Sequence, residues 1–129
     1  MINILIVSSD KDALSGFTST IEKHDDINMS WAESGGKALN MVPVNAFDLV
    51  VTDETLKDMT GLEFARSLVA ASPLVNCSAV SRLSPKAFHE ASEGLGLLMQ
   101  LPPGPGKEHA EKLMQHLRSV LSLTVGRTG

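Results

Sequence analysis

The sequence predicts an α/β fold, a doubly wound parallel sheet of five strands with helices on both faces. Short apolar runs alternate with segments of helical period along the chain, which is typical of a parallel sheet covered by helices. Residues 47–52 form an almost continuously apolar run, as expected of a strand buried on both faces. Asp53 closes this run, at the carboxyl end of a strand, where ligands of such sheets bind.

The composition favours one soluble domain whose partners are proteins. The chain has 129 residues, 43% of them hydrophobic, which suits a single core. A formal net charge of −4, few aromatic residues and no Lys/Arg run argue against nucleic acid as a ligand. No apolar stretch approaches a membrane span, and Cys77 is the only cysteine, so we expect a cytoplasmic domain without an intramolecular disulfide. We assign residues 1–123 to the domain and 124–129 to a C-terminal tail.

The first three elements follow from apolar spacing. Residues 2–7 form the first strand, and Asp10 is placed to cap a helix over 11–24. The apolar face of that helix comprises Leu14, Phe17 and Ile21. In the second strand, 27–32, apolar and polar residues alternate, which indicates an edge strand with one wetter face.

The middle of the chain carries the clearest boundaries. A helix is expected from Gly35 until just before Pro43, followed by a strand over 48–52. Thr60 is placed to cap a helix over 61–71, whose apolar residues recur at helical spacing.

The last third predicts two further strands and two further helices. The strands are expected over 74–80 and 97–101, and Ser84-Pro85 should begin a helix that ends near Gly94. Residues 102–106 contain only Pro and Gly and should separate the last strand from a helix over 107–123.

Three segments resemble the receiver domain of bacterial two-component response regulators. They are residues 32–39, 47–53 and 59–63, and the resemblance extends over nearly the whole chain. It implies a flavodoxin-like sheet with strand order 2-1-3-4-5. It also implies that Asp53 is the phosphoacceptor position and that Gly61, eight positions later, opens the next helix.

Other site positions of that family are occupied by different residue types in this chain. Ser8 and Ser9 stand where the family has an acidic pair that binds Mg²⁺, and neutral hydroxyls are poor ligands for this ion. Leu101 stands where the family has a lysine, and it supplies neither charge nor a side-chain donor. We therefore expect no cofactor, Mg²⁺ being the one candidate, and we expect Ser8 and Ser9 to cap the first helix instead.

Two residues after the fourth strand complete the candidate site. Ser81 matches the family's switch hydroxyl, and Arg82 follows it. Arg82 is a candidate partner for Asp53, because a guanidinium there would replace the missing cations. A solvent-exposed Arg82 is the alternative.

These features predict an atypical receiver module of a two-component phosphorelay rather than an enzyme. It would act through contacts with a histidine kinase, an output protein or an output domain, with weak or absent Mg²⁺-dependent phosphorylation of Asp53. A homodimer remains open. The alternative is a flavodoxin-like protein that binds phosphate or flavin through the Ser8–Ser9 loop at the first helix's N-terminus.

Overall fold

The five predicted strands form one parallel sheet in the order β2-β1-β3-β4-β5, which confirms the predicted topology. The computed structural model describes residues 1–128. The strands are β1 (Ile2–Val7), β2 (Ile27–Ala32), β3 (Leu49–Thr52), β4 (Asn76–Val80) and β5 (Gln100–Leu101). The helices are α1 (Ser15–Glu22), α2 (Gly35–Met41), α3 (Gly61–Ala71), α4 (Pro85–Ala91) and α5 (Lys107–Thr128), with short 3₁₀ helices at Lys11–Leu14 and Val42–Val44.

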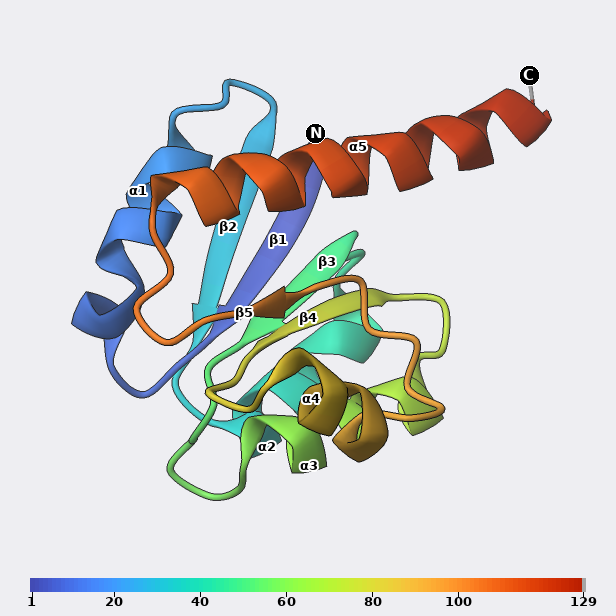
Figure 1. Ribbon diagram of the computed structural model, residues 1–129. Helices are drawn as coiled ribbons and strands as arrows, with labels where there is room; N and C mark the ends of the chain where they lie inside the picture. Colours follow the sequence, from blue (N-terminus) through green and yellow to red (C-terminus); the bar gives the residue numbers. More distant parts are fainter. Residues whose placement is uncertain (129) are drawn as a thin grey trace.

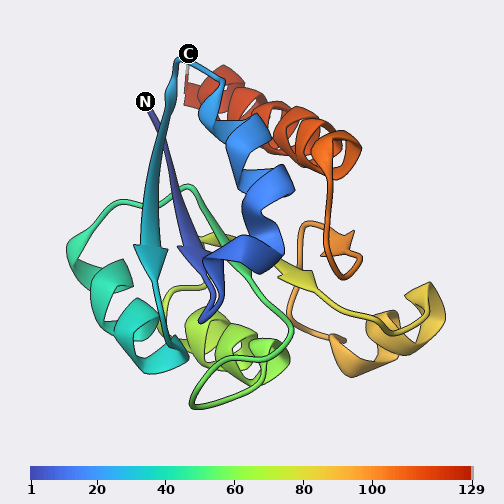
Figure 2. The same cartoon turned by 90° about the vertical axis from the view of Figure 1, so that its left-hand side faces the viewer.

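Helices cover both faces of the sheet. Helices α1 and α5 lie together on one face, and α2, α3 and α4 lie on the other side (Figures 1 and 2). Each face has its own apolar core because β1, β3 and β4 are buried on both sides. The largest fully buried side chains include Phe17 on the α1 face and Phe64 on the α3 face.

Several boundaries differ from the sequence predictions. The segment expected to be a single first helix begins as a 3₁₀ turn and continues as α1 only to Glu22. Strand β4 begins at Asn76 rather than at Leu74, whose side chain is 95% exposed. Helix α4 ends at Ala91, before the predicted Gly94.

The two C-terminal elements also differ from their predicted lengths. Only Gln100 and Leu101 pair as β5. Helix α5 continues past the predicted end at residue 123 and reaches Thr128, so residues 124–128, which we had set apart as a tail, are helical. Residue 129 lies outside the described residues. Within the described range, no helix is both long and apolar enough to cross a membrane.

One buried hydroxyl in β4 gives a stability prediction. Ser78 is fully buried, and its Oγ has no hydrogen-bond partner among the described residues. Burial of an unpaired hydroxyl costs free energy, so Ser78→Ala should raise the free energy of unfolding by about 1 kcal/mol. Urea denaturation followed by circular dichroism would measure this change. Ser119→Ala, at an exposed position on α5, is the matched control and should change stability little. A less stable Ser78→Ala variant would contradict the prediction.

Candidate functional site

Asp53 lies directly after β3, at the carboxyl edge of the sheet, as predicted. Its backbone N–H donates to the Val7 carbonyl oxygen at 2.9 Å, which extends the pairing of β1 with β3. The Glu54 backbone N–H donates to Asp53 Oδ1 at 2.8 Å, and the Ser8 hydroxyl lies 2.9 Å from Asp53 Oδ2. Both carboxylate oxygens therefore face neutral donors, and neither has an ion pair among the described residues.

Ser8 supports the Asp53 carboxylate and does not cap the first helix. Ser8 is 3% exposed, and its Oγ accepts the Asp10 N–H at 3.1 Å. The same Oγ lies 2.9 Å from the Asp10 carbonyl oxygen, so its single proton is shared between that acceptor and Asp53. The prediction that Ser8 and Ser9 cap the helix is wrong, because Ser8 is turned toward Asp53 and Ser9 is exposed.

The Asp10 carboxylate caps the first helical turn instead. It accepts the Asp12 N–H at 3.1 Å, which confirms Asp10 as the N-cap. A negative side chain therefore stands at the helix N-terminus, where the flavodoxin-like alternative requires an anion to bind. This arrangement disfavours a phosphate held by the Ser8–Ser9 loop.

An acidic cavity of about 380 Å³ opens beside Asp53. Its charged lining consists of three carboxylates, from Asp10, Asp53 and Glu54, and one guanidinium, from Arg82. Ser9, Pro103 and Gly104 also line it. Among the described residues, no group of three His, Cys, Asp or Glu side chains is placed to hold a metal ion. The cavity therefore contains carboxylates, but among the described residues they are not grouped as the ligands of one metal ion.

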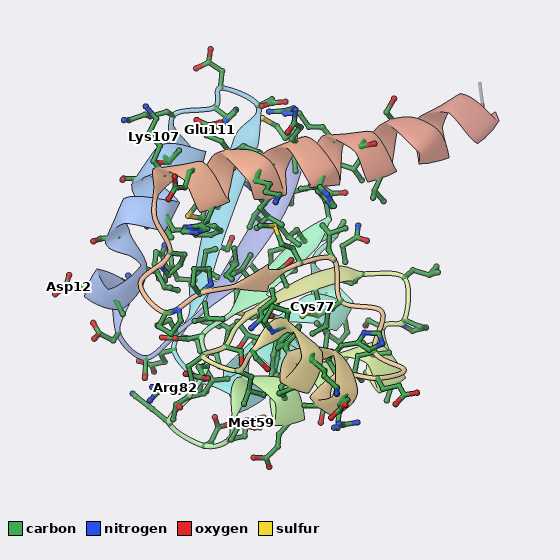
Figure 3. All side chains as sticks on the ribbon, in the orientation of Figure 1. Asp12, Met59, Cys77, Arg82, Lys107 and Glu111 are labelled. Atoms are coloured by element: carbon green, nitrogen blue, oxygen red, sulfur yellow. The ribbon has the colours of Figure 1, made fainter. Side chains whose placement is uncertain are left out.

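Arg82 binds Glu54 rather than Asp53, so the predicted Arg82–Asp53 pair is wrong. The Arg82 Nε–H donates to Glu54 Oε1 at 2.9 Å, and the Arg82 backbone N–H donates to Glu54 Oε2 at 2.8 Å. Partial burial would raise the pKa of Glu54, but these hydrogen bonds outweigh burial and lower it. The Arg82 side chain is 78% exposed and lies at the same end of the sheet as Asp12 and Met59 (Figure 3).

Ser81 and Leu101 lie where the sequence places them, at the ends of β4 and β5. Ser81 is 5% exposed, and its hydroxyl oxygen accepts the Leu83 N–H at 3.2 Å. The Ser81 N–H donates to the Leu101 carbonyl oxygen at 2.9 Å. The Leu101 side chain is fully buried in the core, so this position contributes packing and no polar group to the edge of the sheet.

Three polar side chains that shape this edge were not identified from the sequence: Glu54, Asp58 and Gln100. Asp58 accepts the N–H groups of Gly35 and Gly36 at 3.0 and 2.9 Å, which lowers its pKa and ties the β3–α3 loop to the start of α2. The Gln100 amide donates to carbonyl oxygens of the β4–α4 loop. The position of Glu54 next to Asp53 was the only sequence signal for any of them.

The sequence matches a family model for the response regulator receiver domain over residues 4–102. This match covers most of the chain, including β1 to β5 and the Asp53 edge of the sheet. The chain belongs to the response regulator receiver domain family. Receiver domains are signalling modules of two-component systems, which agrees with the resemblance seen in the sequence. No curated protein matches the sequence.

Solved structures of low sequence identity share the receiver fold. The chain is similar to the N-terminal domain of an uncharacterized protein from Wolinella succinogenes, with a TM-score of 0.79, 21% identity and coverage of 96% of this chain and 99% of that one. It is also similar to the chemotaxis response regulator CheY4 of Vibrio cholerae, with a TM-score of 0.78, 18% identity and coverage of 91% and 98%. A third similar structure is a two-component response regulator from Legionella pneumophila, with a TM-score of 0.74, 20% identity and coverage of 92% of this chain and 99% of that one.

Proposed function

We propose that this receiver domain is atypical and signals through protein–protein contacts, with weak or absent Mg²⁺-dependent phosphorylation at Asp53. One observation carries the proposal: both Asp53 carboxylate oxygens face neutral donors, from Ser8 and from the Glu54 backbone. The positions at which the family has its acidic pair and its lysine hold Ser8, Ser9 and Leu101.

The charge around Asp53 supports this reading. Phosphoryl transfer depends on neutralising the charge of the transferred group, with Mg²⁺ as a main contributor. The cavity offers three carboxylates against one guanidinium, and Arg82 is already paired with Glu54. Mg²⁺ does not fit this donor set well, because a hydroxyl replaces a carboxylate at Ser8 and no group of three carboxylates among the described residues is placed to hold a metal ion.

The partners we propose are proteins: a histidine kinase, an output protein or an output domain, or a second copy of this chain. Such a module would work in the cytoplasm without catalysing a reaction of its own. Under this proposal Asp53 and Ser81 match the family's phosphoacceptor and switch hydroxyl. Ser8 and Ser9 stand in place of the family's acidic pair, and Leu101 stands in place of its lysine.

Beryllofluoride, a mimic of the phosphoryl group, tests the proposal directly. The chain is titrated with beryllofluoride and Mg²⁺ while amide shifts at Asp53, Ser81 and Leu101 are followed by NMR. We expect no saturable shifts, because Leu101 stands at the family's lysine position and no group of three carboxylates among the described residues is placed to hold a metal ion. Asp53→Asn is the control and should be equally silent. Saturable shifts in the wild type that Asp53→Asn abolishes would overturn the proposal.

A further inference from the structure

The loop after β4, residues 81–83, is bound by one side chain that follows β3 and by one side chain of β5. Most of its backbone polar groups have a partner. The Ser81 N–H pairs with Leu101, and the Leu83 N–H pairs with the Ser81 hydroxyl. The Arg82 N–H and the carbonyl groups of Ser81 and Leu83 bind side chains of other elements. Opening this loop would break these hydrogen bonds, and water would only replace partners that the backbone groups already have.

Glu54 binds this loop from the side of β3. Its two carboxylate oxygens accept the Arg82 backbone N–H and the Arg82 Nε–H, at 2.8 and 2.9 Å. One side chain thus fixes both the backbone and the guanidinium of Arg82. The Glu54 side chain is 25% exposed, whereas its partner Arg82 is 78% exposed, so solvent screens the guanidinium pair, and the charge-assisted bond to the Arg82 backbone N–H adds a second contact to the loop.

Gln100 binds the same loop from the side of β5. Its Nε2 group donates to the Ser81 carbonyl oxygen at 3.2 Å and to the Leu83 carbonyl oxygen at 2.8 Å. Both protons of one amide are therefore used on residues that flank Arg82. Glu54 supplies acceptors and Gln100 supplies donors, so the two side chains satisfy complementary groups of the loop.

We propose that Glu54 and Gln100, together called the loop clamp, hold residues 81–83 in one conformation whatever the charge on Asp53. The Asp53 carboxylate itself binds Ser8 and the Glu54 backbone N–H. Within the described residues, no hydrogen bond joins that carboxylate to residues 81–83. The loop is thus tied to its neighbours directly through the clamp, and its only link to the candidate phosphoacceptor among the hydrogen bonds of the described residues runs through the Glu54 backbone.

The loop clamp also fixes the surface beside it. A groove of about 530 Å³ lies between the β3–α3 and β4–α4 loops, and residues of both loops line it. Its walls include Glu54, Thr60, Leu62, Arg82 and Leu83. If the clamp holds the loop, this groove has one shape, and a protein that contacts it meets a preformed surface. Only this signalling consequence rests on the proposed function.

Amide hydrogen exchange tests the loop clamp in the full chain without any phosphodonor. NMR would follow the amides of Arg82 and Leu83 and the Arg82 Nε–H in the wild type and in three variants: Glu54→Ala, Gln100→Ala and Asp53→Asn. We expect the first two variants to speed exchange at these groups about tenfold or more, since each removes two hydrogen bonds to the loop. Asp53→Asn should change it less than about twofold.

Matched controls separate a local effect from a global one. Glu22→Ala and Gln115→Ala change exposed residues of the same types on α1 and α5, and they should leave exchange in the loop unchanged. Slow exchange of the Leu5 and Val50 amides, in the buried strands, reports that each variant is folded. Unchanged protection in Glu54→Ala and Gln100→Ala, or equal loss in Asp53→Asn, would refute the clamp. Because no phosphoryl mimic is added, this result is independent of the beryllofluoride titration.

Discussion

Gly61→Ala should destabilise the protein more than any other single methyl added near the site. A Cβ at residue 61 would lie 2.2 Å from the Asp53 carbonyl oxygen and 3.3 Å from Thr52 Cγ2. The close atom belongs to the backbone, so it cannot move aside as a flexible side chain would. Overpacking of this kind typically costs 1–3 kcal/mol, and we expect about 3 kcal/mol here.

Chemical denaturation would measure this loss, and amide shifts would locate it. The Gly61 N–H donates to the Glu54 carbonyl oxygen at 2.9 Å, so displacement of α3 should shift the amides of Asp53 and Glu54. Gly16→Ala is the control, because Gly16 is exposed in α1 and its added Cβ would come no closer than 3.9 Å to another residue. The same substitution there should stabilise the protein by about 0.5 kcal/mol. Losses of similar size at both glycines would rule out the steric explanation.

The best sequence predictions concern features that local chemistry determines. Helix α3 spans Gly61–Ala71 as predicted, because Thr60 and Glu63 form a capping box that fixes its first turn. The position of Asp53 at the end of β3 could also be predicted from the sequence, because the apolar run of the strand ends at Thr52 and a carboxylate follows it.

The partner of Arg82 depends on geometry that the sequence does not contain. Asp53 and Glu54 are adjacent acidic residues at the end of one strand, and consecutive side chains there point to different sides. The path of the β4–α4 loop brings Arg82 to Glu54. The family's site positions and the missing cations made Asp53 one candidate partner and solvent the alternative, but they carry no information on which of two adjacent carboxylates the loop approaches.

The short β5 has a similar explanation. Residues 97–99 are apolar and half-buried, and Leu98 and Met99 hydrogen-bond to β4, but they lie just before β5 in the connection after α4. Gly94 and Gly96 have positive φ angles of 85° and 63°, which turn the chain before pairing begins. A hydrophobic pattern reports burial, and it does not separate a buried loop from an edge strand.

Ser8→Asp should restore one carboxylate to the site and make the stability of the protein depend on Mg²⁺. The Ser8 hydroxyl lies 2.9 Å from Asp53 Oδ2 and is 3% exposed, so the new carboxylate would face Asp53 at close range with little water between them. Two carboxylates in such a place repel each other. Without Mg²⁺ we expect the free energy of unfolding at pH 7 to fall by about 2 kcal/mol.

Mg²⁺ should reverse much of this loss in Ser8→Asp and in no other variant. At a concentration ten times its dissociation constant, a ligand of the folded state adds about 1.4 kcal/mol. Urea denaturation with Mg²⁺ and with a chelator would measure the difference. Ser8→Asn is the control, because an Asn side chain has nearly the same size as Asp and carries no charge, so it separates charge repulsion from overpacking. Asp53→Asn in the Ser8→Asp background should remove the repulsion and most of the Mg²⁺ effect.

The outcome for the wild type decides what the substitution means. If Ser8 is the reason that the site binds Mg²⁺ poorly, the wild type gains nothing measurable from the ion and Ser8→Asp gains stability. Equal gains in both would show that Asp53 and Asp10 hold Mg²⁺ without a further carboxylate, and the account of a depleted site would fail. A gain confined to Ser8→Asp would show that the fold still positions Asp53 for a metal and that one hydroxyl in place of a carboxylate removes it.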